Sequence, residues 1–382
     1  MAALRFFFYV LMKPFTLGFA LLGLGGIIAP YTDPNEWWLP AFSGLFLPGI
    51  LIVNFIVLFF WIYQRKWWIV CPLIALSANY DFFASMYRFP GAKMPENTAG
   101  QPVTVATYNI EGAYWITKFP EKYSVKKMIQ DYNIDILCFQ EFCEDAATTL
   151  DSALQRFNMP YRVSFFNRQS QWANCGTVIY SKYPIVNHGE ISFNSEINGA
   201  LWADIKINRD TIRVFNNHLQ TTNFSQNQLE YKRQKSVRDW KGQAHTLVKI
   251  LDCLKNNFQE RANQSILVRK MIDTSCYPVI VCGDFNDTPV SFAFNHIISN
   301  DLKDGFRDCG RGYGHSFNGL KRLLRIDFMA YGEYFTGMEY LSPEQAWSDH
   351  NPVIMKLILK NEPESGIPSS LSCGYGYKPG KI

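Results

Sequence analysis

The chain has 382 residues, which exceeds one average domain. Charged residues make up 18% of it, against roughly 25% in typical soluble proteins, and nearly all of this shortfall lies before residue 90. A formal charge of +4 is too small to indicate nucleic-acid binding by composition, and nine cysteines without a CxxC spacing indicate neither a disulfide scaffold nor a zinc site. Most cysteines, such as Cys138 and Cys282, lie in apolar runs and are interpreted as small core residues.

The first ninety residues contain two apolar runs, 6–30 and 41–63, that each reach the ~20 residues needed to cross a bilayer. The first run carries a single charge, Lys13, and the second carries none. A cleaved signal peptide is the alternative for the first run, but the second run follows at once and no small-x-small site follows Pro30, so an uncleaved anchor is favoured. Residues 67–80 form a shorter apolar run that either crosses a third time or lies at the interface.

The basic residues of this region predict its orientation. Arg5 and Lys13 precede or enter the first run, the loop 31–40 has acids but no lysine or arginine, and QRK (64–66) follows the second run. Because positive residues favour the cytoplasmic side, we expect the amino terminus inside and the loop 31–40 outside. We favour three spans, which make the chain a multi-pass protein of the cytoplasmic (inner) membrane with its remaining residues on the external, periplasmic face. With two spans those residues stay in the cytoplasm.

The hydrophobic pattern divides the chain into an anchor at 1–87, a linker at 88–102 that contains proline and glycine, a domain at 103–360, and a tail at 361–382 that is predicted to be flexible. Strands are predicted at 103–110, 134–142, 177–181, 200–207, 211–219, 277–285, 326–332 and 352–359. Helices are predicted at 124–132, 146–157, within 226–272 and at 292–298. Strands and helices are interleaved, yet several strands follow one another directly, which indicates an α/β domain with mixed sheets, two in number.

Polar side chains lie at or beside one end of six of the predicted strands, and this is hard to explain by turns alone. They are Asn109 with Glu111, Gln140 with Glu141, Asn217 with His218, Asp284 with Asn286, Asp327, and Asp349 with His350. Four strands end in them, Asp327 is early in its strand, and Asp349 and His350 come just before the last strand. Buried carboxylates must be paired or bind a metal, and oxygen donors of this kind suit Mg²⁺ or Mn²⁺. Histidines beside them can move protons near neutral pH. The pattern therefore indicates metal-assisted attack of water on a phosphate ester.

The order of the motifs TYN, QE, NHL, GDFND, RIDF and SDHNP resembles the endonuclease/exonuclease/phosphatase superfamily over residues 103–360. This superfamily includes pancreatic-type deoxyribonucleases, abasic-site endonucleases, neutral sphingomyelinases and inositol-polyphosphate 5-phosphatases. With its apolar amino-terminal region, the chain resembles bacterial membrane-anchored members. The resemblance implies a four-layer α/β sandwich of two packed mixed sheets flanked by helices, and Mg²⁺ (or Mn²⁺) as cofactor. The implied partners are a phosphate-ester substrate (nucleic acid, phospholipid or soluble phosphate) and the lipid bilayer, with no obligate protein partner indicated.

The resemblance also implies a set of metal ligands. Glu141 matches the acid that ligates the divalent ion, and Asn109 matches the residue beside it. Asp349 matches another acid of the metal site, and Glu111 lies where some members carry a second one.

The remaining matches imply catalytic roles. Asp284 and Asn286 match the pair that orients the attacking water and the scissile phosphate, and His218 matches a histidine that contacts the phosphate or transfers protons. Histidine at that position is typical of the deoxyribonuclease- and sphingomyelinase-like branch. His350 matches the histidine that polarises the phosphate or acts as acid or base, with Asp327 as its orienting partner. The acid that steadies the first histidine in deoxyribonucleases has no match at 167–174, so we expect His218 to be oriented differently.

Four polar features have a plainer interpretation beside the functional one. Asp287 fits a helix N-cap better than a ligand, and Asp327 can form an ion pair with Arg325. His315 fits a surface turn better than a substrate contact, and 231–241 fits a solvated helix face better than a surface for anionic lipid or nucleic acid. For the whole protein we expect a membrane-anchored, divalent-metal-dependent phosphoesterase acting on a phosphodiester or phosphomonoester. The alternative is a non-catalytic, membrane-tethered binding domain that retains the fold.

Overall fold

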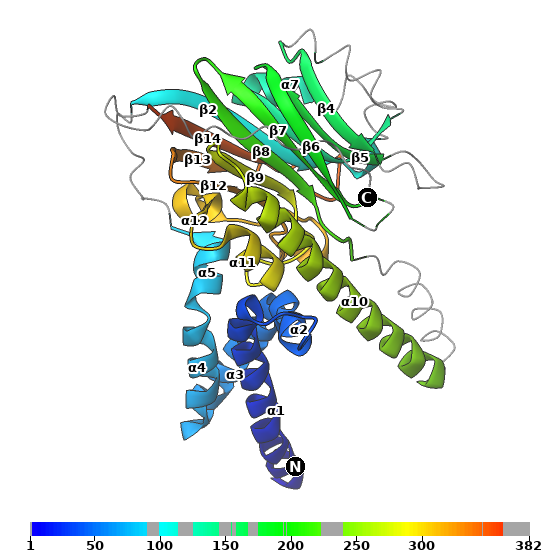
Figure 1. The fold of residues 1–382 in the computed structure, drawn as a ribbon. Helices are drawn as coiled ribbons and strands as arrows, with labels where there is room; N and C mark the ends of the chain where they lie inside the picture. Colours follow the sequence, from blue (N-terminus) through cyan, green and yellow to red (C-terminus); the bar gives the residue numbers. More distant parts are fainter. Residues whose placement is uncertain are drawn as a thin grey trace.

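The computed structural model describes residues 2–89, 99–113, 125–144, 154, 158–166, 175–193, 195, 197–222, 240–345 and 347–361. Outside them lie the predicted helix at 146–157 apart from Leu154, the segments 167–174 and 231–239, and the predicted tail from 362 onward. The described helices and strands form a sandwich domain and, below it in Figure 1, a group of amino-terminal helices.

The sandwich domain contains two six-stranded sheets. The first has the order β10 (Lys303–Asp304), β12 (Asp327–Tyr331), β9 (Val279–Asp284), β8 (Asp210–His218), β7 (Gly199–Ile207), β6 (Ile185–Ser192). The second has the order β13 (Phe335–Leu341), β14 (Val353–Lys360), β2 (Gly100–Asn109), β3 (Ile136–Cys143), β5 (Cys175–Ser181), β4 (Tyr161–Phe166). One pair in each sheet is parallel, β8 with β9 and β2 with β3, and the other pairs are antiparallel. Both sheets are therefore mixed, as predicted.

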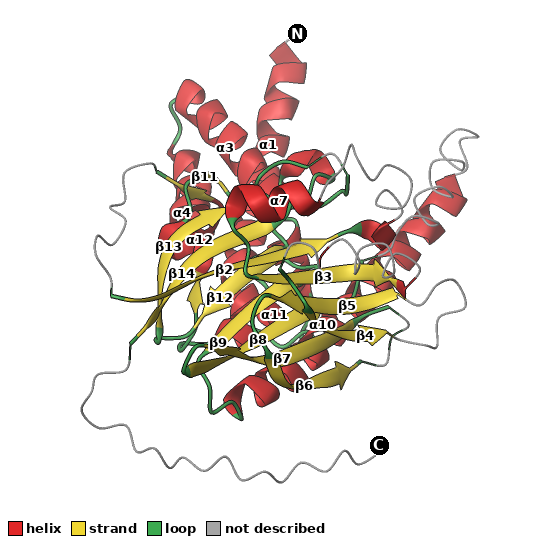
Figure 2. Cartoon of the chain, turned by 90° about the horizontal axis from the view of Figure 1, so that it is seen from above, coloured by secondary structure: helices red, strands yellow, loops and turns green. Residues whose placement is uncertain are grey.

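Helices cover the outer faces of the two sheets, which gives four layers (Figures 1 and 2). On the second sheet, α7 (Val125–Tyr132) buries Met128 and Ile129 in one cluster with Phe139. On the first sheet, α10 (Trp240–Asp273) and α11 (Phe292–Ile298) bury Val268 and Phe294 in one cluster with Phe328. Short elements complete the domain: η3 (Glu111–Ala113), α12 (Gly305–Cys309), β11 (Gly312–Tyr313) and η4 (Leu320–Arg322). The predicted four-layer sandwich is confirmed.

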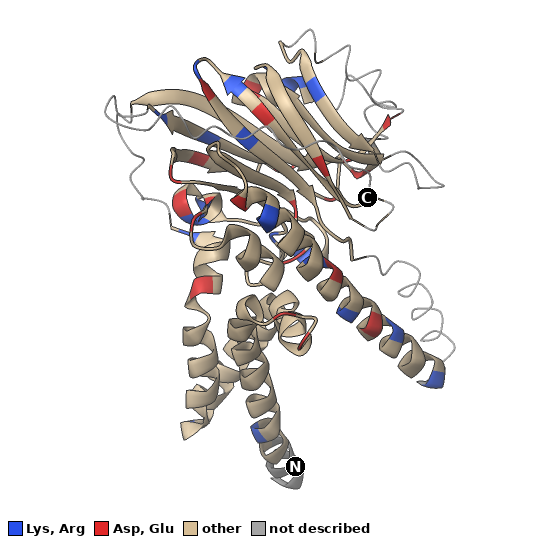
Figure 3. Ribbon diagram, viewed as in Figure 1, with Lys and Arg blue, Asp and Glu red and all other residues tan. Residues whose placement is uncertain are grey.

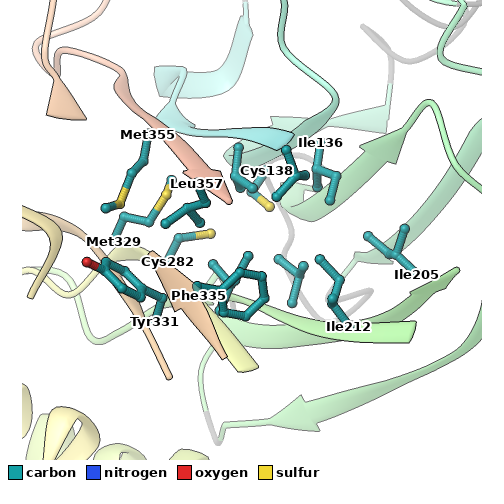
Figure 4. Close-up of a cluster of buried hydrophobic side chains, with 14 of the residues drawn as sticks. Ile136, Cys138, Ile205, Ile212, Cys282, Met329, Tyr331, Phe335, Met355 and Leu357 are labelled. Carbon is teal, nitrogen blue, oxygen red and sulfur yellow. The ribbon is translucent and has the colours of Figure 1, made fainter. Parts of the chain in front are cut away.

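The inner faces of the sheets enclose a hydrophobic core that turns polar at one end. Side chains alternate between the two faces of a strand, and along β9 the inward positions run from Ile280 and Cys282 to Asp284. Along β8 they run from Ile212 and Val214 to Asn216 and His218. Figure 4 shows the apolar part, where Ile136 and Met355 of the second sheet lie across the core from side chains of the first sheet such as Ile212. The core thus gives way to acids, amides and imidazoles at the carboxyl ends of the parallel strands.

The amino-terminal helices are α1 (Ala2–Ile28), α2 (Leu39–Leu45), α3 (Leu47–Gln64), α4 (Val70–Ala78) and α5 (Tyr80–Met86), with η1 (Ala29–Tyr31) and η2 (Trp67–Ile69) between them. Two stretches, Tyr9–Tyr31 and Leu47–Gln64, are long and apolar enough to cross a membrane, and a third crossing is added if the α4–α5 pair, bent by 50°, is one span. Asn79 at this bend donates its Nδ2 to the carbonyl of Gly23, 2.9 Å away. The bent α4–α5 pair is thereby held against α1.

The amino-terminal helices are packed directly on the sandwich domain. Leu47, Leu51 and Met86 share a cluster with Val290, and the Thr288 hydroxyl donates to the Gly44 carbonyl at 3.1 Å. The strand β1 (Tyr87–Arg88) pairs with β11, and Asp81 forms an ion pair with Arg307 at 3.0 Å. The segment predicted as a linker, 88–102, therefore begins in β1 and ends in β2, and its residues 90–98 lie outside the described part.

Candidate active site

Strand register brings the predicted residues of the first sheet together. Asp284 at the end of β9 is directly opposite His218 of β8 on one side and Asp327 of β12 on the other. In the second sheet, Asn109 at the end of β2 is opposite Gln140 of β3, the residue before Glu141. Because the carboxyl ends of both parallel pairs point to the same end of the sandwich, one cluster forms between the two sheets.

Unusual backbone conformations aim these side chains. Gly283 has φ of 129°, and a Cβ there would lie 2.0 Å from the Asn217 carbonyl oxygen, so the strand that ends in Asp284 requires glycine. Glu141 and Asn286 have φ of 51° and 52°, which is uncommon for residues other than glycine. At Glu141 this accompanies a register shift in the β3–β5 pairing, which breaks the alternation of the strand.

Asn109 holds two carboxylates side by side. Its Nδ2 donates to Glu141 Oε1 at 3.1 Å and to Asp284 Oδ2 at 3.0 Å, while its Oδ1 accepts the backbone N–H of Glu111 at 3.1 Å. Asp284 is fully buried, and the Glu141 side chain is 28% exposed. The amide therefore joins a buried acid of the first sheet to a more accessible acid of the second.

His350 and Asp327 form a dyad. His350 Nδ1 donates to Asp327 Oδ2 at 2.8 Å, while its Nε2 lies 3.7 Å from both Asp284 Oδ2 and Asp349 Oδ1. Burial lowers the pKa of His350, but Asp327 and Asp284 outweigh it and raise the pKa to about 10. Ser316 supports the dyad, since its hydroxyl accepts the backbone N–H of Asp327 at 2.9 Å. His350 is thus held as an imidazolium with Nε2–H facing the acids.

Among the described residues, the Nδ1 side of His218 faces a backbone carbonyl. Its Nδ1 lies 3.3 Å from the Ile197 carbonyl oxygen, which can only accept, so the hydrogen bond places a proton on Nδ1. Its Nε2 is 3.3 Å from the Thr221 hydroxyl, 3.5 Å from Glu141 Oε1 and 4.0 Å from Asp284 Oδ2. The expectation that this histidine is oriented differently is consistent with the Ile197 contact.

Asn286 is tied to the same strand ends. Its backbone N–H donates to Asp284 Oδ1 at 2.8 Å, and its Nδ2 donates to the Leu219 carbonyl at 3.1 Å. The GDFND motif therefore folds back on itself and onto the end of β8.

The cluster has the donor set that a hard cation requires. Burial and the charge of Asp349 raise the pKa of Glu111. Burial and the charges of Glu141 and Asp284 raise the pKa of Asp349, although His350 opposes this. Such repulsion between carboxylates is relieved by a divalent ion with oxygen ligands. The buried Asp327 Oδ1 also lacks a hydrogen-bond partner. The ligand atoms of Asp284, Asp327 and His350 lie within 4.8 Å of one another, which is close enough to hold a metal ion.

Several plainer interpretations are corrected. Asp287 is not the cap of α11, because that cap is Ser291, whose hydroxyl accepts the N–H of Phe294. Asp287 instead accepts from Arg261 Nε at 2.9 Å, and both side chains are buried.

The Asp327–Arg325 ion pair is also wrong, since Arg325 is bonded to Asp304 at 2.6 and 2.9 Å. His315 is half-buried, stacks on Tyr313 and faces the Asn351 amide at 3.4 Å, so it is more than a free surface turn.

The cysteines also depart in part from expectation. Cys138 and Cys282 are buried and free, as predicted. Cys143 and Cys175, however, form a disulfide across the β3–β5 pairing, two residues beyond Glu141. Nothing in their spacing indicated the pair, because the partners are 32 residues apart and meet only through strand register.

The residues that support the site were not singled out from the sequence. They are Ser316, Ser348, Thr221, Arg261 and the Ile197 carbonyl. Ser348 lies inside the SDHNP motif and donates to the Asn109 carbonyl at 2.8 Å, so the motif itself was the available signal. The others lie in no recognised motif and are positioned by the fold.

Two mixed sheets that face each other and carry acids, amides and histidines at their joined strand ends define a class of four-layer α/β sandwich proteins. The chain belongs to the Endonuclease/Exonuclease/phosphatase family, whose model matches residues 106–350. Members of that family hydrolyse phosphate esters. A second model, Domain of unknown function (DUF8431), matches residues 5–86.

Solved structures share the fold at low identity. An endonuclease/exonuclease/phosphatase from Bacteroides vulgatus is 18% identical with a TM-score of 0.51, and the match covers 68% of this chain and 100% of that chain. A family protein from Bacteroides thetaiotaomicron is 16% identical with a TM-score of 0.52, over 71% and 100%. No curated protein matches the sequence.

Proposed function

We propose that the protein is a membrane-anchored, divalent-metal-dependent phosphoesterase. The observation that carries this proposal is the convergence of Asp284, Asp327 and His350 from the first sheet and the last motif with Asn109 and Glu141 from the second. The acids suit a divalent ion, and that ion together with the protonated histidine suits an anionic substrate whose transition state gains negative charge on oxygen.

We assign the ion to Glu141, Glu111 and Asp349, with Asn109 beside them. The group Asp284, Asp327 and His350 suits it less well, because His350 is bonded to Asp327 at 2.8 Å and its pKa is raised by the acids, and a protonated imidazole has no lone pair for a metal. The Asp349 side chain is 50% exposed, so this side of the cluster is open to an ion and a substrate. When bound, a divalent ion neutralises phosphate charge and makes an attacking water more acidic.

The protein side chains then divide the remaining work. Asp284, buried and facing both histidines, accepts the proton of the attacking water, while Asn286 helps to orient that water and the phosphate. His350 donates from Nε2 to a phosphate oxygen, and Asp327 keeps its ring in place through Nδ1. His218 presents Nε2 to the same space from the β8 side.

A chelator is expected to abolish hydrolysis by the full chain in detergent, and Mg²⁺ or Mn²⁺ to restore it. Glu141→Gln should raise the Mg²⁺ concentration needed for half-maximal rate, because it removes one of the carboxylate charges. Glu190→Gln, on the exposed edge strand β6, is the matched control and should not. Full activity in excess chelator contradicts the proposed metal site.

A panel of substrates tests the alternative of a non-catalytic binding domain. The panel contains bis-p-nitrophenyl phosphate, plasmid DNA, RNA, sphingomyelin and inositol phosphates, each with and without the divalent ion. Hydrolysis of any of them, lost in His218→Ala, supports the enzyme. Binding without turnover across the whole panel would favour the binding domain.

We further propose that the sandwich domain lies on the external face of the cytoplasmic membrane. The disulfide Cys143–Cys175 supports this placement, because disulfides persist in oxidising compartments. The arrangement in Figure 1 also supports it. The amino terminus is at the end of α1 that points away from the domain, and QRK (64–66) precedes the end of α4 that points away from it. The domain is therefore on the side opposite to the basic residues that favour the cytoplasm.

A topology measurement checks this placement. Alkaline phosphatase fused after Gly100 is expected to be active, since it is exported with the domain. The same reporter fused after Gln64, between α3 and α4, is expected to be inactive. Inactive enzyme at Gly100, with fluorescence from a cytoplasm-only reporter there, would place the domain inside.

A further inference from the structure

Helix α10 extends well beyond the sandwich domain. Near its carboxyl end, Val268 and Ile272 pack on the first sheet. In its middle, Leu254 and Phe258 pack on Ala41 of α2. Gln259 Nε2 donates to the carbonyl of Pro34, in the loop before α2, at 3.3 Å. Because the helix is continuous over its 34 residues, the turns before Leu254 pass the level of that loop (Figure 1). Residues 240–251 therefore lie at the level of the amino-terminal helices and away from the sheets, and at their outer end they are apart from those helices (Figure 1).

These first turns carry an exposed apolar stripe. Leu247, Val248 and Leu251 are 46%, 55% and 40% exposed, and their spacing places them on one face of the helix. Among the described residues, no hydrophobic cluster takes in these three side chains. The stripe contrasts with Leu254 on the next turn, which is 1% exposed because α2 covers it.

The charge of these turns indicates what the stripe meets. Residues 240–251 contain two lysines, Lys241 and Lys249, and no acid. Both lysines are exposed on the face that adjoins the stripe, where, among the described residues, Asp252 on the next turn is the one exposed acid beside them. Figure 3 shows basic residues at the outer end of α10 and basic and acidic residues alternating nearer the domain. An apolar stripe flanked by lysine is the pattern of helices that lie at a bilayer surface rich in anionic lipid.

We propose that residues 240–251 are a second membrane-contact surface. Leu247, Val248 and Leu251 enter the boundary of the acyl chains, and Lys241 and Lys249 meet lipid phosphates. This inference rests on the proposed membrane anchor, because the amino-terminal helices, which α10 contacts through α2, set the position of the bilayer beside α10. The occupant is an anionic bilayer, and a second copy of the chain is the competing occupant.

The same helix holds the segment that follows His218. Arg261 donates from one guanidinium nitrogen to the Gln220 carbonyl at 3.0 Å and to the Thr222 hydroxyl at 2.8 Å. Gln264 accepts the backbone N–H of Gln220 at 2.7 Å. Membrane contact through α10 therefore fixes the orientation of this end of β8 relative to the bilayer.

The test places a fluorescent amino acid at Val248 of the full chain, reconstituted in nanodiscs that contain an anionic phospholipid. A matched probe replaces Lys270, which is exposed on the domain end of the same helix. The Val248 probe should be quenched several-fold more by nitroxide-labelled acyl chains than the Lys270 probe, and should be shielded from aqueous iodide. Equal access of iodide to both probes overturns the proposal. Shielding from iodide without quenching by the lipid nitroxide also overturns it, because protein then covers the stripe.

Charge reversal tests the lysines separately. The pair Lys241→Glu and Lys249→Glu is expected to reduce lipid quenching of the Val248 probe several-fold in anionic nanodiscs, and unchanged quenching would contradict their assigned role. These measurements require no turnover, so they are repeated in Asp284→Asn. Equal quenching there, with hydrolysis lost, supports the contact surface independently of the proposed activity. Loss of quenching in Asp284→Asn would overturn the proposal, because contact of residues 240–251 with the bilayer should not depend on the active site.

Discussion

Asp284→Asn is expected to lower kcat about 100-fold or more, on the scale seen when one transition-state contact is removed. Asp284 is fully buried, and its Oδ2 lies 3.7 Å from His350 Nε2 and 4.0 Å from His218 Nε2. Asparagine keeps the shape but cannot accept the proton of water. Because the loss concerns the transition state, KM should change far less than kcat.

The measurement is steady-state hydrolysis of whichever panel substrate is turned over, with thermal melting in parallel. Asp252→Asn, on the exposed face of α10, is the matched control and should leave kcat unchanged. Wild-type kcat in Asp284→Asn would remove Asp284 from the mechanism. A lower melting temperature alone would indicate a structural role instead.

Arg261→Met is expected to destabilise the protein by about 3–5 kcal/mol, because it leaves a buried carboxylate without its partner. Arg261 and Asp287 are 0% and 4% exposed, and their atoms are 2.9 Å apart. Burial already raises the pKa of Asp287, and Arg261 opposes this shift more than the backbone N–H of Thr288 does. The double variant Arg261→Met with Asp287→Leu removes both charges and should recover a large part of the lost stability.

Thermal and denaturant unfolding of the full chain in detergent measures this effect. The control is Arg322→Met, whose ion pair with Glu344 is at the surface, with both side chains at least half exposed, and is expected to be worth about 0–1 kcal/mol. If the single and double variants of the buried pair unfold alike, the cost does not come from an unpaired charge.

The fold was predictable where strands are buried on both faces. Strands such as β9 and β8 combine an apolar run with a polar end, and both features can be recognised within a few consecutive residues of the sequence. Three of the longer strands, β4, β6 and β13, were missed, and so were the two-residue strands β1, β10 and β11. The β6 sequence IVNHGEIS has five exposed positions out of eight, so its pattern is too polar to indicate a strand, and its conformation depends on pairing with β7.

The candidate site was predictable to the extent that its residues lie in motifs. Those motifs stand at strand ends, where backbone register places them together. The supporting contacts were not predictable, because they join segments that are distant in sequence. Arg261 meets Asp287 across 26 residues, and Ser348 meets Asn109 across 239. A hydrophobic period gives the face of a helix but not its partner, so the packing of Leu47 on Val290 was equally hidden.

The packing of the amino-terminal helices on the sandwich domain affects how the protein can be produced. A soluble fragment cut at residue 90 would lose β1, the partner of β11, and would leave Val290, Leu254 and Phe258 without the side chains that cover them. Newly exposed apolar patches of this kind promote aggregation. Purification and crystallisation therefore call for the intact chain in detergent or lipid, and trimming the hydrophobic part to gain solubility would give a damaged molecule.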